Sequence, residues 1–149
     1  MVDNRSIQSR SALMSRVSSR NTGPEMVVRR LLHAAGYRFR LHRRGLPGTP
    51  DIVFGSRRKI IFVHGCFWHG HDCQLGRLPR SRVTFWAEKQ RRNRQRDLAN
   101  VTALESCGWT VMVVWQCELK IRQELLNRLL TFLGGSPSKN LINEMRIDR

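Results

Sequence analysis

Hydrophobic positions along this chain follow two periods, which predict a succession of helices and strands. After the capping-box spacing of Thr22 and Glu25, apolar residues recur every three or four positions as far as Gly36, as in an amphipathic helix. Alternating or continuous apolar segments then predict four strands, and two more helices are predicted further along. The strands are predicted at 37–41, 51–54, 59–64 and 109–115, and the later helices at about 84–106 and 121–133.

The order of these elements predicts an α/β fold with a mixed central β-sheet flanked by helices. Segments 51–54 and 59–64 are separated by a short turn and predict an antiparallel hairpin. A long helix joins 59–64 to 109–115, which is the connection that parallel strands require. The length of 149 residues fits one domain. We therefore predict a folded domain at 21–133, between a basic N-terminal arm at 1–20 and a flexible C-terminal tail at 134–149.

The charge of the chain indicates a polyanionic partner. It has 27 Lys and Arg residues against 11 Asp and Glu, a formal net charge of +16. No apolar run approaches the roughly 20 residues that cross a bilayer, and the Ser- and Arg-rich N-terminus lacks the apolar core of a secretory signal, although a transit peptide has a similar composition. Four cysteines are too few for a disulfide scaffold, which favours a metal site or free thiols. The composition is typical of a cytosolic protein that handles nucleic acid.

Asp51 is a candidate catalytic carboxylate. It follows Pro50 and opens the apolar segment 52–54. A lone carboxylate there is commonly a turn or edge residue, but in so basic a chain it is also a natural ligand for Mg²⁺. A helix with an early glutamate followed by Pro-Asp and a strand resembles the PD-(D/E)xK nuclease core. The next strand departs from that pattern because it ends in Val63-His64, without the expected acid and lysine. A metal would then be held by Asp51, a backbone carbonyl near Val63, water and phosphate, with a histidine in place of the lysine.

The loop after this strand has the composition of a zinc site. Cys66, His71 and Cys73 offer three ligands, and Zn²⁺ prefers four. The fourth is predicted to be Cys117, because Cys66 and Cys117 each lie two residues beyond the end of a strand, and parallel neighbours would bring those ends together. Free thiols and solvated histidines are the alternative. Cys107 is predicted to be an ordinary core cysteine.

Two histidines, His64 and His69, remain outside the predicted zinc site. A neutral imidazole can accept a proton from water or donate one to a leaving group. Asp97 on the long helix is placed to hydrogen-bond a histidine and fix its tautomer, although on an arginine-rich helix it can equally be a solvated ion-pair partner.

Aromatic and basic residues surround the same loop. Phe67 and Trp68 lie between glycines, and Trp86 precedes the basic run 89–96. The aromatic residues either cover the zinc site or form a wedge that enters the base stack of DNA. The basic run fits phosphate contact better than an ordinary solvated face.

Taken together, these segments resemble the very short patch repair (Vsr) endonucleases over roughly residues 10–133. The residues that carry the resemblance are Pro50 to Phe54, Phe62 to His69, His71, Cys73, Phe85-Trp86, Asp97, Gly108-Trp109 and Val114 to Cys117. The string Val-His-Gly-Cys-Phe-Trp-His is the most specific of them. The resemblance implies a restriction-endonuclease-like fold and an Mg²⁺-dependent enzyme that nicks DNA 5′ of the thymine in T:G mismatches left by deamination of 5-methylcytosine.

The resemblance also implies roles for individual residues. Asp51 and the carbonyl of Val63 would bind Mg²⁺, and His69 would be the general base, oriented by Asp97, with His64 and Glu25 nearby. A structural Zn²⁺ and an aromatic DNA wedge are implied as well. The zinc ligands would be Cys66, His71, Cys73 and Cys117, and the wedge would be Phe67, Trp68 and Trp86, with an N-terminal arm around Met14 that grips the DNA. From the basic run itself, Arg91, Arg92 and Arg94 are predicted to bind DNA as well. The expected partner is double-stranded DNA with a T:G mismatch, acted on by a monomer in the bacterial cytoplasm, with mismatch-repair proteins as further partners.

One position departs from the family, and two other functions are consistent with the residues. The family pattern implies threonine at position 63, where this chain has Val63. The change has no consequence if the metal binds only the backbone carbonyl, whereas a ligand is missing if the metal binds the hydroxyl. The alternatives are a sequence-directed nuclease with the same core and a zinc-stapled DNA-binding module without catalysis. The DNA-binding module would give Asp51, His64 and His69 no function.

Overall fold

The computed structural model describes residues 21–134, and the predicted N-terminal arm and nearly all of the predicted tail lie outside this range. The helices and strands appear in the predicted order. They are α2 (Gly23–Ala34), β1 (Arg40–Leu41), β2 (Ile52–Phe54), β3 (Lys59–His64), α3 (Val83–Ser106), β4 (Thr110–Trp115) and α4 (Arg122–Leu133), with short 3₁₀ helices η1 (Gln74–Gly76) and η2 (Gln116–Lys120).

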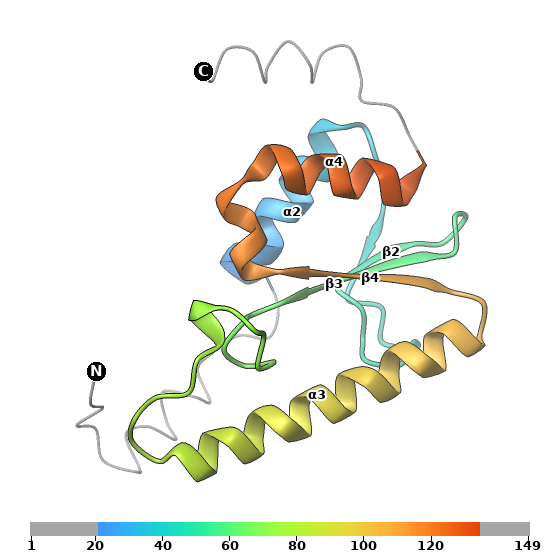
Figure 1. Ribbon diagram of the computed structural model, residues 1–149. Helices are drawn as coiled ribbons and strands as arrows, with labels where there is room; N and C mark the ends of the chain where they lie inside the picture. Colours follow the sequence, from blue (N-terminus) through green and yellow to red (C-terminus); the bar gives the residue numbers. More distant parts are fainter. Residues whose placement is uncertain (1–20, 135–149) are drawn as a thin grey trace.

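The sheet is mixed, as predicted, with the strand order β1-β2-β3-β4. β2 runs antiparallel to β1 and to β3, and β3 pairs with β4 in parallel over six residue pairs. The helix α3 forms the crossover between β3 and β4. It covers one side of the sheet, and α2 and α4 cover the other (Figure 1). The predicted α/β class is therefore confirmed.

The first strand is shorter than predicted. Only Arg40 and Leu41 of segment 37–41 pair with β2, opposite Val53 and Ile52. The aromatic rings of Tyr37 and Phe39 instead pack edge-on against Phe54, with centroids 6.2 and 5.9 Å apart. Their alternation therefore reflects contact with the core more than strand pairing.

Two buried clusters hold the layers together. Alternating residues of β3 serve both, with Ile61 packing under α2 and α4 while Ile60 and Phe62 face α3. The long helix contributes few apolar side chains: Leu104 packs near its C-terminal end, and Trp86 and Gln90 are buried near its start. The middle of α3 thus faces a polar region at the end of β3. None of the helices within 21–134 is long and apolar enough to span a membrane.

The prediction that Cys107 is a core cysteine is wrong, because its side chain is exposed. Cys107 caps the C-terminus of α3, and its carbonyl accepts a hydrogen bond from Arg58 at 2.7 Å. The next apolar residue, Trp109, fills the core at this point. The guanidinium of Arg58 lies over its ring, 4.4 Å from the ring centroid.

The turn that precedes Asp51 lies against α3. Gly48 has φ +78°, and a Cβ there would lie 2.8 Å from the side-chain amide nitrogen of Asn100. Only glycine allows both the left-handed backbone and this close approach. The position of Asp51 therefore depends on a turn that is seated directly on the helix.

We expect Gly48→Ala to lower the free energy of unfolding by about 2 kcal/mol, because it adds backbone strain and a contact that is too short. Urea denaturation followed by circular dichroism would measure the loss. Gly45→Ala in the same turn region is the matched control, because a Cβ there has no heavy atom within 4 Å. Equal effects of the two substitutions would contradict the assigned packing.

Candidate functional site

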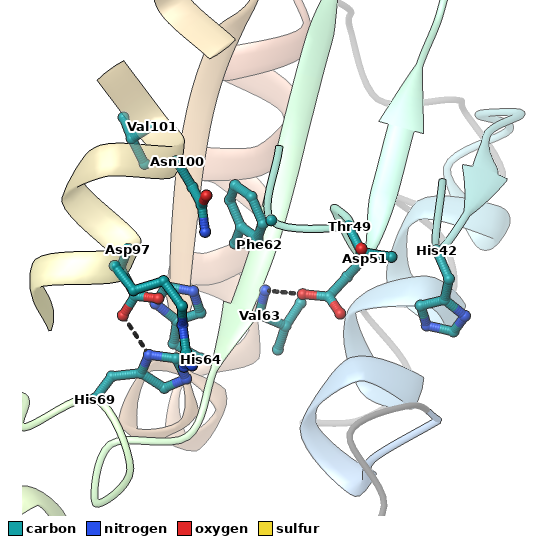
Figure 2. A pocket seen from close by; sticks show the side chains of 12 residues that line it. His42, Thr49, Asp51, Phe62, Val63, His64, His69, Asp97, Asn100 and Val101 are labelled. Atoms are coloured by element: carbon teal, nitrogen blue, oxygen red, sulfur yellow. Dashed lines mark hydrogen bonds and ion pairs between the residues drawn. The ribbon is translucent and has the colours of Figure 1, made fainter. Parts of the chain in front are cut away.

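A cavity of about 490 Å³ opens where β3 ends, between α3 and the turn before β2. Figure 2 shows carboxylate and imidazole side chains converging on it from several elements. Twelve residues line it: His42, Gly48, Thr49, Asp51, Phe62, Val63, His64, His69, Arg96, Asp97, Asn100 and Val101. The predicted residues Asp51, Val63, His64, His69 and Asp97 are thus brought together.

Asp51 is fixed by the backbone of the neighbouring strand. Its Oδ2 accepts a hydrogen bond from the N–H of Val63 at 2.8 Å. Val63 lies beyond the last residue pair of β2 and β3, Ile52 with Ile61, so the carboxylate takes the place of a strand as its partner. Because the N–H and C=O of one strand residue point to the same side, the carbonyl of Val63 also lies on the Asp51 side.

A second carboxylate stands beside Asp51. Ligand atoms of Glu25, His42 and Asp51 all lie within 4.8 Å of one another. Burial raises the pKa of Asp51 to about 7, and the neighbouring Glu25 contributes to this rise, while the Val63 N–H opposes it. Two crowded carboxylates and a nearby backbone carbonyl are a donor set that suits a hard divalent cation. The residues present therefore fit the predicted Mg²⁺ site.

The opposite wall of the cavity carries a carboxylate–imidazole pair. Nδ1 of His69 lies 2.5 Å from Oδ2 of Asp97 on α3. Because a carboxylate accepts, the hydrogen-bonded Nδ1 carries the proton and Nε2 is left with its lone pair. His64 stacks face to face on His69 with centroids 3.8 Å apart. Burial lowers the pKa of His64 to about 4, so this ring is neutral at neutral pH.

Side chains of α3 hold the loop that bears His69. The amide of Gln90 donates to the carbonyls of Phe67 at 2.6 Å and Gly76 at 3.2 Å. Asn93 donates to the carbonyl of Trp68 at 2.7 Å. These contacts explain why the buried face of the helix is polar: it binds the backbone of a loop in place of packing against a strand.

The predicted zinc ligands form a compact cluster. Ligand atoms of Cys66, His71, Cys73 and Cys117 all lie within 4.8 Å of one another. Tetrahedral Zn²⁺ places its ligands roughly 3.3–3.8 Å apart, and Sγ of Cys117 lies 3.5 Å from Nδ1 of His71. Three sulfur atoms and one imidazole nitrogen in this arrangement fit a structural metal, which would join the loop to the end of β4.

The aromatic residues form a second cluster, built from two residues of this loop and one of α3. The rings of Phe67, Trp68 and Trp86 contact one another edge-on, with centroids 5.3 to 6.1 Å apart. Phe67 and Trp68 are partly exposed, whereas Trp86 is buried beneath them. The ring that stacks on the ligand His71, at 4.1 Å, is that of Trp115. Trp115 therefore packs against the Cys/His cluster, while Phe67 and Trp68 remain partly open to solvent.

The arginines of α3 face different directions. Arg91 and Arg92 bind Glu88 on the outer side of the helix, and Arg94 reaches the carbonyl of Gly70 at 3.5 Å. Arg96, which was not among the predicted site residues, lines the cavity. The sequence did offer a signal for Arg96. Asn100 lies four positions after Arg96 and three after Asp97, so in a helix these side chains project to the same side. Met14, the remaining predicted DNA contact, lies outside the described residues.

His42 is the other functional residue that sequence reasoning missed. The strand predicted at 37–41 assigned no role to His42, but a φ of +46° takes the chain out of the strand conformation there and turns the side chain toward the cavity. The sequence offered no signal for this change, because a left-handed histidine has no characteristic neighbours.

The comparisons with known proteins agree with this geometry. A family model described as DNA mismatch endonuclease Vsr matches residues 2–75. The chain is 56% identical over 136 residues to the type II nicking enzyme V.XorIIP of Xanthomonas oryzae pv. oryzae, covering 91% of this chain and 100% of the relative. It is 44% identical over 133 residues to the type II nicking enzyme V.NmeAIP of Neisseria meningitidis, covering 87% and 95%. It is 40% identical over 131 residues to the DNA mismatch endonuclease Vsr of Escherichia coli, covering 88% and 84%.

The chain belongs to the Vsr family of DNA mismatch endonucleases. The resemblance drawn from its motifs is thereby confirmed, and so is the expectation that it is a DNA endonuclease. The cavity at the end of β3 is the candidate active site, because it is where carboxylates and histidines of the specific motifs meet.

We expect the purified protein to contain about one zinc per chain and Cys73→Ser to lose most of it, because Zn²⁺ binds thiolates far better than hydroxyls. The same substitution should lower the melting temperature, since the metal joins the loop to the sheet. Elemental analysis and thermal denaturation would measure both effects. Cys107→Ser is the control, because Cys107 is exposed and outside the cluster. Metal contents that are equal in the two variants would contradict the assignment.

Proposed function

We propose that this enzyme is an Mg²⁺-dependent endonuclease that nicks DNA 5′ of the thymine in T:G mismatches left by deamination of 5-methylcytosine. The observation that carries the proposal is the opposition, across one cavity, of the cation-binding Asp51 and the His69–Asp97 pair. A structural Zn²⁺ at the Cys/His cluster is part of the proposal. The proposed substrate is double-stranded DNA, acted on by a monomer in the bacterial cytoplasm, with mismatch-repair proteins as further partners.

In this mechanism Asp51 and the carbonyl of Val63 would hold Mg²⁺, with Glu25 close by. When bound, the ion neutralises charge on the scissile phosphate and lowers the pKa of water. His69 accepts the proton of the attacking water at Nε2, the nitrogen that Asp97 leaves unprotonated. As the water oxygen bonds to phosphorus, the bond between phosphorus and the leaving oxygen breaks, and solvent protonates that oxygen. Asp97 then stabilises the imidazolium that forms, and the neutral His64 packs against the ring and fixes its plane.

Arg96 supplies a positive charge on the α3 wall of the cavity. Among the residues of 21–134 that line the cavity, it is the sole lysine or arginine. Phosphodiester cleavage builds negative charge on the phosphate oxygens, and a cation positioned beforehand stabilises that charge. We therefore assign Arg96 to the scissile phosphate, and Arg91 and Arg92 to contacts with the flanking DNA backbone.

Mismatch recognition is assigned to the aromatic cluster. Phe67 and Trp68 lie two and one positions before His69 on the same short loop, so a base step that they separate lies beside the general base. A mismatched pair is easier to unstack than a matched one, which gives a wedge selectivity for the mismatch. The relatives named as type II nicking enzymes favour a second candidate, a nuclease directed by sequence, because in a restriction setting the flanking bases would define the target.

Nicking of labelled duplexes in Mg²⁺ tests the proposal. A duplex with T:G in a CTWGG context should be cut 5′ of the mismatched thymine, whereas the same duplex with T:A should stay intact. Duplexes with T:G in other flanking sequences measure the dependence on context. Equal cutting of T:G and T:A would contradict the mismatch requirement and support the sequence-directed nuclease.

The proposed role of Asp51 is tested in the same assay. Asp51→Ala should lower the nicking rate at least about a hundredfold, because the residues that remain hold the cation poorly, while affinity for the duplex is largely kept. Gel shift in EDTA measures that affinity independently of cutting. Glu105→Ala, at an exposed position far along α3, is the control for a lost carboxylate. A variant that binds poorly but cuts normally when saturated with DNA would refute this role.

The assignment of the arginines is tested by comparing Arg96→Gln with Arg92→Gln. The first should lower the single-turnover rate by about one to two orders of magnitude at saturating DNA. The second should weaken binding and reduce its salt dependence while leaving the rate of the bound complex close to normal. Similar effects of the two substitutions on the rate would show that the cavity arginine has no special part in the chemistry.

A further inference from the structure

Glu25 is a buried carboxylate whose two oxygens have different partners. The residue is almost fully buried, at 1% exposure. Oε2 accepts from the backbone N–H of Asn21 at 3.1 Å and from the guanidinium of Arg29 at 3.3 Å. Oε1, the other oxygen, is bonded to His42, with Nε2 of the ring 2.7 Å away. A carboxylate only accepts, so His42 carries the donating hydrogen on Nε2.

His42 is tied to Asp51 as well as to Glu25. Its backbone N–H donates to the carbonyl of Asp51 at 3.1 Å, just after the last residue pair of β1 and β2. The left-handed backbone at His42 lets this main-chain bond form while the side chain crosses to α2. The ring lines the cavity and points from the strand side toward α2, beside Asp51 (Figure 2). One residue thus links both carboxylates of the cation site.

We propose that His42 is a positioning residue for the nicking reaction, which holds Glu25 beside Asp51 in the orientation that the catalytic cation requires. The inference rests on the proposed function, because it assumes that Asp51 binds a divalent cation. Without the ring, Oε1 would be a buried acceptor with no donor, and the carboxylate would turn toward Arg29 to share its guanidinium. Arg29 approaches from along α2, so this rotation takes charge away from Asp51.

The His42–Glu25 pair and the His69–Asp97 pair on the opposite wall have exchanged roles. There a carboxylate, Asp97, orients an imidazole, His69. Here an imidazole, His42, orients a carboxylate, Glu25. Residues that orient the ligands of a metal commonly change its affinity or the activity by 10- to 100-fold when they are replaced. His42 would therefore affect binding of the cation more than folding or DNA binding.

The test compares His42→Gln with His42→Leu in the full chain. Glutamine keeps a donor near the place of Nε2, whereas leucine has none, and neither residue is favoured at positive φ, so backbone strain affects both alike. We expect His42→Leu to raise the Mg²⁺ concentration for half-maximal nicking about tenfold or more, and His42→Gln to restore most of the loss. Affinity for duplex in EDTA and the melting temperature should be the same in the two variants. His33→Leu, an exposed histidine on α2, is the control and should match the wild type.

Calorimetric titration of the protein with Mg²⁺ makes the test independent of cutting. Weaker binding in His42→Leu than in His42→Gln supports the positioning role, even if the T:G preference is wrong and the proposed function fails. Equal Mg²⁺ binding in the two variants and the wild type overturns it, even if T:G duplexes are nicked as proposed. A loss in His42→Leu that tracks its melting temperature, with no rescue by glutamine, also overturns it, because it would show a merely structural contact.

Discussion

The parallel pairing of β3 with β4 is the interaction on which the rest of the site depends. The two strands are in register up to His64 with Trp115, so everything that follows either strand begins at the same edge of the sheet. Cys66 and Cys117 each lie two residues further on, and the same register brings them into one cluster. The crossover helix α3 must run back from this end of the sheet to the start of β4, and on that path Asp97 lies within reach of His69. A shift of one residue in the pairing would separate all of these partners.

The burial of charged side chains is the second constraint. The two walls of the cavity meet this constraint in different ways. On the β2 side the carboxylates of Asp51 and Glu25 crowd together, which raises the pKa of Asp51 and creates a site that a divalent cation would stabilise. On the α3 side a single carboxylate, Asp97, is matched to an imidazole. One wall is suited to cation binding and the other to proton transfer, and the cavity between them has room for a phosphodiester.

The sequence was sufficient wherever a residue's position follows from a regular element. The link between Cys66 and Cys117 could be predicted across fifty residues, because strand ends and the rule for parallel crossovers determine it. His42 could not, since its place depends on one left-handed residue at the end of a two-residue strand. The failure at Cys107 has a related cause. Apolar type suggested burial, but the residue caps a helix, and the neighbouring Trp109 takes the place in the core.

Val63 contributes to the site through its main chain. Its backbone N–H holds Asp51, and its carbonyl lies on the same edge of the strand, so both contributions to a cation site come from the main chain. The side chain of a strand residue points away from the plane of the sheet, and the contacts that fix Asp51 do not involve it. A hydroxyl would be needed only if it bound the cation directly, in addition to the carbonyl. The contacts that form the site are therefore complete with valine, which is consistent with an active nuclease and with the carbonyl as the ligand.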